Sequence, residues 1–257
     1  MSGFNLTEKS LRHALHRGDI KPAFQPVILA PQGKLVGLEV LARWYLSDGS
    51  SVPPEEFIKI STRCGLEAVI AKVLMKSAAP TVCRLSKQLM KPLIIGFNAG
   101  PTCLVDPVFE ASCVEFNRIC RGQGVSLAVE VTERDPLSPE IKKYLKQLQN
   151  IGATLVLDDY GSGYSKADVL TWMKPQILKL DRSLTMLAGD NQSAIKLSRL
   201  LESISCSGAQ VLAEGVENQK EYHWFFKHGV RLFQGYFFSH PLSAEMLETT
   251  ISSGAFN

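Results

Sequence analysis

Two adjacent aspartates, Asp158 and Asp159, interrupt an apolar stretch of the sequence just before a glycine-rich segment. Successive residues of a strand point to opposite faces, so both carboxylates can reach one object only if the strand ends between them. Neighbouring like charges also repel one another unless a cation lies between them. The pair therefore indicates a metal site, although an aspartate that caps a strand end is the commoner explanation of such residues.

Other apolar stretches also carry a single polar residue late in their length. When residues are sorted by the two-residue period of a strand, each polar residue lies on the face opposite the bulky aliphatic side chains. Seven stretches contribute one such residue each: Glu39, Asn98, Glu130, Asp158, Lys179, Glu214 and Gln234.

Each of these residues has a purely structural explanation when it is taken alone. Glu39 or Glu130 could pair with Arg43 or Lys179, and a long lysine side chain could also reach outward to water. Asn98 could cap a turn, and Gln234 could bond to the backbone.

Taken together, the carboxylates exceed the cations that could neutralise them. Burying such uncompensated charge is costly unless a divalent metal is present. Ligand sets made of oxygen alone favour Mg²⁺ or Mn²⁺ over zinc. Two metals roughly 3.5 to 4 Å apart, bridged by a carboxylate, are a common device for phosphoester hydrolysis. Asp158 could bridge two ions, and Asp159 could bend back to the second.

The elements that must position these residues alternate along the chain. Strands are expected over 24–29, 35–44, 93–99, 126–133, 153–159, 176–181, 209–216 and 231–236, and helices over 6–18, 54–64, 67–90, 106–121, 139–150, 166–173, 191–205, 218–228 and 243–252. The first two strands form a hairpin, and the rest alternate with helices, which predicts parallel pairing. We therefore expect a TIM-like α/β fold, a (β/α)8 barrel with an antiparallel first strand, whose late inward residues meet at the C-terminal mouth.

The composition is that of a globular protein. The 257 residues are 45% hydrophobic and 21% charged, which excludes disordered and fibrous classes. The net charge of +3 is scattered, so no nucleic-acid partner is expected. Six cysteines without a C-x-x-C pair indicate free thiols in a reducing compartment.

One domain over residues 1–257 is expected, with a motif-bearing core at about 20–245 after an N-terminal helix. The first ten residues lack a basic segment followed by an apolar run, so no leader peptide is expected, and no apolar run approaches 18 residues. We expect a cytoplasmic protein, or the cytoplasmic part of a longer protein with a sensor or membrane segment outside this chain.

Seven sequence blocks carry a resemblance to a known family. They are EVLAR, FNAG, EVTE, DDYGSGYS, LKLDRS, AEGVE and QGYFFSHPL, in this order. The chain resembles the EAL-domain cyclic di-GMP phosphodiesterases over about residues 20–245. The resemblance implies a barrel with an antiparallel first strand, a homodimer, and hydrolysis of cyclic di-GMP to the linear dinucleotide pGpG.

The resemblance also implies roles for single residues. The ligands of one metal correspond to Glu39, Asn98, Glu130 and Asp158, and those of a second to Asp158 and Asp159. Lys179 resembles the residue that orients or deprotonates the attacking water, and Glu214 and Asp159 resemble catalytic carboxylates. The substrate contacts correspond to Gln25, Leu41, Arg43 and Gln234, and Glu133 resembles the acid that holds the loop after Asp159. Two Mg²⁺ or Mn²⁺ ions are expected as cofactors, with Ca²⁺ inhibitory.

Two departures from the family pattern occur. Val40 stands where the family has alanine, and the loop continues as Ser165, Lys166 and Ala167 where the family usually has Ser-Ser-Leu. An alternative function is that of a catalytically inactive relative that binds cyclic di-GMP or a protein partner. Such relatives typically lose ligand carboxylates or the lysine, and this chain has lost none of them, which favours the enzyme. Next to two bound cations, the pKa of Lys179 is expected to fall.

Overall fold

The protein is described here from a computed structural model that covers residues 6–132, 138–161, 167–188 and 191–256. Its strands are β1 Ile20–Leu29, β2 Lys34–Tyr45, β3 Ser51–Val52, β4 Leu93–Asn98, β5 Val125–Thr132, β6 Thr154–Tyr160, β7 Ile177–Leu180, β8 Gln210–Ala213 and β9 Leu232–Phe233. They pair in the order β1-β9-β8-β7-β6-β5-β4-β2, and β2 pairs again with β1. Eight strands thus close into a barrel, while β3 adds to the outer side of β2.

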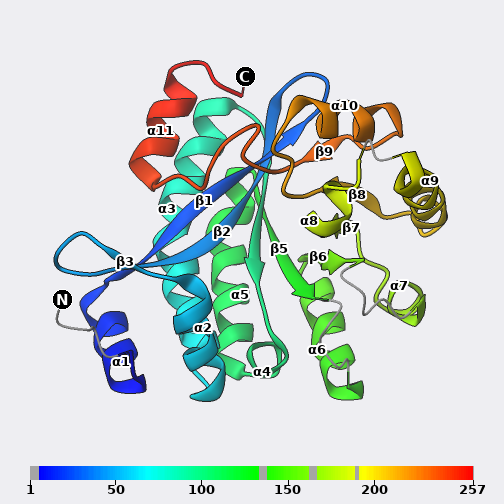
Figure 1. The fold of residues 1–257 in the computed structure, drawn as a ribbon. Helices are drawn as coiled ribbons and strands as arrows, with labels where there is room; N and C mark the ends of the chain where they lie inside the picture. The colour runs from blue at the N-terminus through cyan, green and yellow to red at the C-terminus, as the bar shows by residue number, and fades with distance from the viewer. Residues whose placement is uncertain (1–5, 133–137, 162–166, 189–190, 257) are drawn as a thin grey trace.

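The first strand runs against its neighbours. β1 pairs antiparallel with both β2 and β9, whereas the remaining pairs around the ring are parallel. The predicted barrel with an antiparallel first strand is confirmed. In Figure 1, β4 and β5 run toward the side where the short helix α4 lies, which is the C-terminal mouth of the barrel.

Helices cover the outside of the barrel. They are α1 Glu8–Arg17, α2 Pro54–Arg63, α3 Glu67–Leu89, α4 Pro101–Leu104, α5 Pro107–Cys120, α6 Pro139–Asn150, α7 Ala167–Met173, α8 Arg182–Thr185, α9 Asn191–Ser205, α10 Gln219–Lys227 and α11 Ala244–Ser252, with a 3-10 turn at Arg121–Gln123. Local sequence sets several of their starts. The side chain of Ser138 accepts the backbone N–H of Ile141 ahead of Pro139, as a capping residue does.

Two apolar layers hold the barrel together. The outward residues of β5, Leu127, Val129 and Val131, are buried beneath the helices. Phe97 of β4 meets Phe116 of α5 edge to face, with ring centroids 5.1 Å apart. A smaller apolar cluster, which includes Ala128, fills part of the barrel interior.

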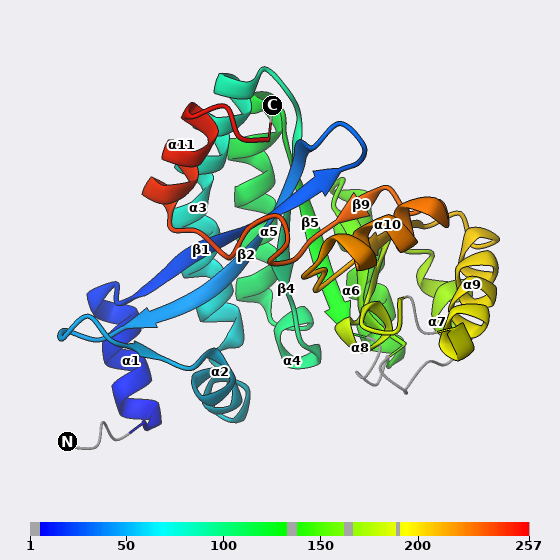
Figure 2. The ribbon, with the colours of Figure 1, turned by 45° about the horizontal axis from the view of Figure 1, so that its top comes forward.

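The C-terminal helix lies beside a helix from the first third of the chain. Figures 1 and 2 both show α11 next to α3. Arg84 of α3 forms a 2.5 Å ion pair with Glu248, and Gln88 donates to Ser252. Among the described residues, no helix is long and apolar enough to cross a bilayer.

Several predicted boundaries were wrong near the mouth. β8 ends at Ala213 and β9 at Phe233, so Glu214 and Gln234 lie just beyond their strands. β7 ends at Leu180 because the side chain of Asp181 caps α8 by accepting the backbone N–H of Ser183. By contrast, β6 continues through both aspartates to Tyr160.

Candidate active site

A buried lysine lies at the centre of the carboxylates. The Nζ atom of Lys179, on β7, lies 2.8 Å from Glu130 Oε2, 3.1 Å from Glu39 Oε2 and 3.2 Å from Asp158 Oδ2. Glu214 Oε2 is 3.4 Å away. The lysine side chain is only 2% exposed, so it does not reach outward to water. One ammonium thus serves four carboxylates from four different strands or strand ends.

Amide side chains hold Glu39 in place. Asn98 Nδ2 donates to Glu39 Oε1 at 2.8 Å, and Gln234 Nε2 donates to Glu39 Oε2 at 2.9 Å. The Nδ2 group of Asn98 is thus engaged with Glu39, which leaves its amide oxygen for another partner. Gln25 of β1 pairs in register with Glu39 of β2, which puts both side chains on one face of the sheet.

Glu130 reaches the cluster across a glycine of the next strand. An added Cβ at Gly96 would lie 1.8 Å from Glu130 Oε1, closer than any real contact. Gly96 also pairs in register with Glu39. The missing side chain at this position therefore lets the two carboxylates approach one another.

The two aspartates are separated by an irregularity in β6, not by its end. The pairing with β7 shifts register between Leu157 and Tyr160, and Asp159 has a φ of 54°. Such a bulge interrupts the two-residue alternation, so Asp159 need not point to the face opposite Asp158. Its backbone N–H donates to Asp158 Oδ1 at 2.8 Å. The expectation that the strand ends between them was wrong.

The pKa values of the two central glutamates are shifted in opposite directions. Burial raises the pKa of Glu130, and the charges of Glu39 and Asp158 raise it further, so it lies well above its ordinary value despite Lys179. At Glu39 burial also acts to raise the pKa. There Lys179 and the hydrogen bonds from Asn98 and Gln234 outweigh burial, and the pKa is lowered.

The lysine and the fourth acid are shifted as well. Burial disfavours the ammonium of Lys179, but the surrounding carboxylates outweigh it and hold its pKa well above the ordinary value. The predicted fall in the pKa of Lys179 concerns a site with two bound cations and stays a prediction. Burial raises the pKa of Glu214 to about 8, although its side chain is 30% exposed.

The acidic residues can hold a metal. Carboxylate oxygens of Glu39, Glu130 and Asp158 all lie within 4.8 Å of one another, close enough to contact one ion. The donor atoms are oxygens, which suit hard divalent cations. Three carboxylates in contact with a single ammonium leave negative charge in a buried place, and a cation would compensate it.

A pocket of about 450 Å³ adjoins the cluster and contains two of the predicted substrate contacts. Leu41 and Arg43 of β2 line it together with Asn98. Arg43 Nη1 donates to the carbonyl oxygen of Ala42. The pocket thus lies at the C-terminal ends of β2 and β4.

One acidic residue of this pocket, Glu67, was not identified from the sequence. Glu67 lines the pocket, and its carboxylate accepts from Thr62 Oγ1 at 2.8 Å and from Thr102 Oγ1. Its sequence position reads as an ordinary acid in the first turn of a helix. The available signal was that the helix begins on the mouth side, directly after β2 and α2.

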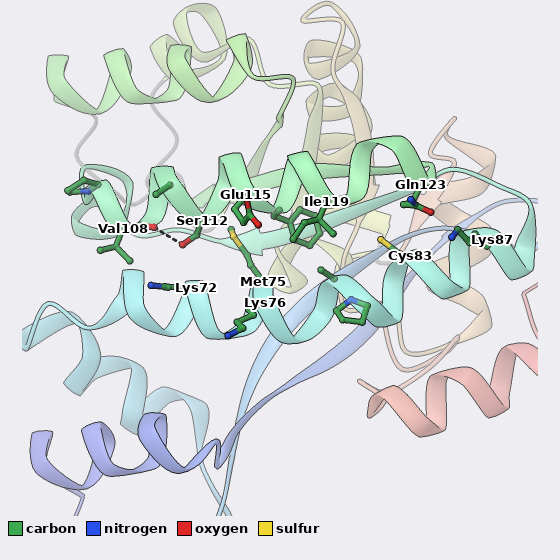
Figure 3. Close-up of a pocket in the computed structure, with 15 residues that line it drawn as sticks. Lys72, Met75, Lys76, Cys83, Lys87, Val108, Ser112, Glu115, Ile119 and Gln123 are labelled. Atoms are coloured by element: carbon green, nitrogen blue, oxygen red, sulfur yellow. Dashed lines mark hydrogen bonds between the residues drawn. The ribbon is translucent and has the colours of Figure 1, made fainter.

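The predicted loop anchor, Glu133, lies outside the described residues, as do Ser165 and Lys166. A further hollow, of about 790 Å³, lies on the outside of the barrel between α3 and α5. Figure 3 shows Lys72, Lys76 and Lys87 of α3 facing it, opposite Val108 and Ile119 of α5. It contains none of the predicted site residues that the structure describes.

Fold and site together define a TIM-like barrel whose mouth carries a buried cluster of oxygen ligands. The chain belongs to the EAL domain family, whose model matches residues 8–241. It is 30% identical over 240 residues to cyclic di-GMP phosphodiesterase PdeL of Escherichia coli strain K12, covering 92% of this chain and 66% of PdeL. It is also 30% identical over 239 residues to the probable cyclic di-GMP phosphodiesterase PdeG of the same strain, covering 92% of this chain and 47% of PdeG. The chain therefore spans less than two thirds of either relative.

Solved structures share the fold. The PaMucR phosphodiesterase in complex with c-di-GMP has a TM-score of 0.81 and 25% identity, covering 93% of this chain and 98% of that one. The EAL enzyme Bd1971 with bound cAMP and cyclic di-GMP has a TM-score of 0.85 over 95% of this chain and 68% of that one. At 22% identity, the second likeness shows the fold alone.

Proposed function

We propose that this chain hydrolyses cyclic di-GMP to linear pGpG and requires two divalent cations. The observation that carries the proposal is the buried cluster, in which four carboxylates surround the ammonium of Lys179 at 2.8 to 3.4 Å. A structural relative named as a phosphodiesterase, PaMucR, has been solved in complex with c-di-GMP, which supports this substrate.

The carboxylates would hold the cations. We assign one ion to Glu39, Asn98, Glu130 and Asp158, and the second to Asp158 and Asp159. Asn98 keeps its amide oxygen for this role while its Nδ2 donates to Glu39. The ions would be Mg²⁺ or Mn²⁺, and they would supply charge stabilisation for an in-line displacement at phosphorus.

Lys179 and Glu214 would orient the attacking water and take part in proton transfer. As an ammonium among the carboxylates, Lys179 can orient the attacking water. To accept the proton of that water it must be the neutral amine, a form that two bound cations would favour. Glu214 is more exposed than the other acids, and its raised pKa of about 8 suits proton exchange near neutral pH.

The pocket beside the cluster would hold the substrate. Arg43 can offer a planar fork to a phosphate, and Leu41 an apolar surface to a base. Gln25 and Gln234, near Glu39, would contact the substrate from the other side. Glu67 adds a carboxylate held by two hydroxyl groups, which can accept the N1–H and N2–H donors of a guanine.

Further expectations about the chain belong to the same proposal. We propose a single EAL domain, a homodimer and a cytoplasmic location. Light scattering on the purified chain tests the dimer.

The test of the function is to incubate the purified chain with cyclic di-GMP and Mg²⁺ and to separate the products. We expect stoichiometric conversion to pGpG over many turnovers. The alternative, a receptor that binds cyclic di-GMP without cleaving it, predicts saturable binding and no pGpG. That outcome would overturn the proposal.

A further inference from the structure

The barrel interior contains a cavity of about 230 Å³ beneath the carboxylate cluster. Its walls are inward residues of the strands, among them Ala128, Val156, Ile177 and Leu212. The barrel of such folds is normally filled by layers of bulky branched side chains. Here one such layer is incomplete.

The missing volume has an identifiable origin in the sequence. Ala128 of β5, an inward residue that lines the cavity, offers only a methyl group where a larger aliphatic side chain would fill the space. Gly37 and Gly96 also line the cavity, but a Cβ at Gly96 would collide with Glu130 Oε1 and one at Gly37 with the carbonyl oxygen of Ile94, so neither glycine accounts for the empty volume. The space is bounded by aliphatic residues of several strands, among them Val156 of β6, Ile177 of β7, Leu212 of β8 and Leu232 of β9.

The cavity reaches toward the end of the barrel opposite the mouth. Its lining includes Ile94, near the start of β4, and Gln210, the first residue of β8. Ile94 is 36% exposed, and Gln210 is also exposed. A small molecule could therefore enter from the N-terminal face without passing through the carboxylate cluster.

A buried acceptor at the cavity lacks a donor. Gln234 lines the cavity and is completely buried. Its Nε2 donates to Glu39 Oε2, which fixes the orientation of the amide because a carboxylate cannot donate. Within the described part of the chain, Gln234 Oε1 has no hydrogen-bond partner. Buried polar atoms normally have one, so this oxygen offers a place for a donor from a ligand.

We propose that the cavity binds a small uncharged molecule with one ring and one hydrogen-bond donor, of which phenol is the simplest example. An engineered apolar cavity of about 150 Å³ binds benzene, so the space here accommodates a ring and its hydroxyl group. The hydroxyl group donates to Gln234 Oε1, and the ring contacts Val156, Ile177 and Leu212. A charged ligand is disfavoured because the neighbouring Lys179 and Glu39 already pair with each other.

Calorimetric titration with phenol and toluene tests the proposal without reference to hydrolysis. We expect saturable binding of phenol, about ten-fold tighter than toluene, which has the same shape but no donor. Ala128→Leu extends a side chain into the cavity and should abolish binding of both molecules. Ala111→Leu, the same change at an exposed position of α5, should leave phenol affinity unchanged.

The location is tested by a crystal soaked with 4-iodophenol. An anomalous iodine peak inside the barrel is expected, and this result does not depend on whether Ala128→Leu folds. Absence of that peak at saturating 4-iodophenol would overturn the site. Equal affinity for phenol and toluene would overturn the role of Gln234, and undiminished binding in a folded Ala128→Leu variant would place the ligand elsewhere. Because none of these readouts uses cyclic di-GMP, a failure here is distinct from a failure of the proposed hydrolysis.

Discussion

At the scale of single residues, the site depends on the balance between Lys179 and the acids around it. The buried ammonium lies within 3.4 Å of four carboxylates. Removing it would leave buried carboxylates without a partner, a change that strongly destabilises proteins unless another cation compensates. Comparisons of lysine variants are therefore meaningful only with Mg²⁺ present.

We predict that Lys179→Ala separates chemistry from binding. Affinity for cyclic di-GMP should stay within several-fold of wild type, while kcat should fall by about 10² to 10⁴, the range of a general acid or base. Initial rates and equilibrium binding, both measured in Mg²⁺, check this. Lys76→Ala, at an exposed position of α3, is the control and should behave as wild type. A near wild-type kcat for Lys179→Ala would make the lysine structural.

A second residue-scale prediction concerns pH. Glu214 has a folded-state pKa of about 8, above its ordinary value of 4.5, and the pKa of Glu130 is raised in the same direction. At these two acids the folded protein therefore binds more protons than the unfolded chain between pH 4.5 and pH 8, so the stability that they contribute is complete below pH 4.5 and is lost as the pH rises to 8. In EDTA we expect Tm to fall by several degrees from pH 5 to pH 8.

Glu214→Gln is the matching variant for this pH effect. Because the amide does not titrate, the decrease in Tm should become shallower in differential scanning calorimetry. A wild-type Tm that stays constant or rises over the same pH range would contradict the assignment. Lys179 does not contribute there, because its pKa lies above 10.5 in the folded state and the lysine is charged throughout.

Glu67 carries the third residue-scale prediction. Its carboxylate lines the pocket of about 450 Å³ and is held by Thr62 and Thr102. Glu67→Gln replaces one acceptor with a donor, which should repel the N–H groups of a guanine and raise KM about ten-fold with little change in kcat. Steady-state kinetics on Glu67→Gln and on the exposed Glu55→Gln control measure this. Equal KM values in the two variants would show that Glu67 does not contact the substrate.

The sequence predicts which residues meet at the mouth better than it predicts their protonation states. The two-residue period brings Glu39, Glu130 and Asp158 to one face, and the structure brings their oxygens within 4.8 Å. The raised pKa that Lys179 has among the carboxylates alone could not be predicted, because it depends on distances to four acids from separate strands. Glu67 was missed because helical periodicity carries no information about which pocket a first-turn residue borders.

At the scale of elements, the spacing of β4 and β5 decides whether Glu130 can join Glu39. Gly96 provides that spacing, since a Cβ there would collide with Glu130 Oε1. We predict that Gly96→Ala folds but displaces the Glu130 carboxylate and lowers affinity for Mn²⁺ about 10- to 100-fold, as changes next to metal ligands do. Isothermal titration with Mn²⁺ measures this.

The matched control for this variant is Gly122→Ala. An added Cβ at Gly122 meets no atom within 4 Å, so metal affinity should be unchanged there. Unaltered Mn²⁺ affinity in Gly96→Ala would show that Glu130 does not need its present position. Loss of folding would be visible as loss of the helical circular dichroism signal.

Element boundaries were predictable for some of the longer helices and less so at the mouth. The helices over 139–150 and 191–205 have the expected bounds. The helices α4 and α8, each four residues long, and the two-residue β3 were missed, because such short elements contain no full period of a pattern. The bulge at Asp159 depends on the pairing of β6 with β7, which local sequence does not encode.

At the scale of the whole molecule, the cluster joins strands from separate parts of the barrel. Its acids come from β2, β5, β6 and the end of β8, and its lysine comes from β7. The regular alternation of strands and helices predicted the closed ring, because each βα unit must place its strand beside the last. The unfilled interior was not predictable, since it depends on the summed side-chain volumes of eight strands.

Since the proposed cations would bind the folded barrel and not the unfolded chain, metal should stabilise the whole molecule. At pH 8 we expect Mg²⁺ at about 100 times its dissociation constant to add about 2.7 kcal/mol to the free energy of unfolding. Urea denaturation with and without Mg²⁺ measures this difference. An unchanged denaturation midpoint would contradict binding to the folded state.

The most direct test of the central claim is the rate of pGpG formation after removal of metal by EDTA and readdition of single ions. We expect no turnover in EDTA and recovery with Mg²⁺ or Mn²⁺. With Ca²⁺ we expect binding of cyclic di-GMP without turnover, because Ca²⁺ tolerates looser coordination geometry. Full activity in excess EDTA, or equal rates with Ca²⁺ and Mg²⁺, would contradict the account.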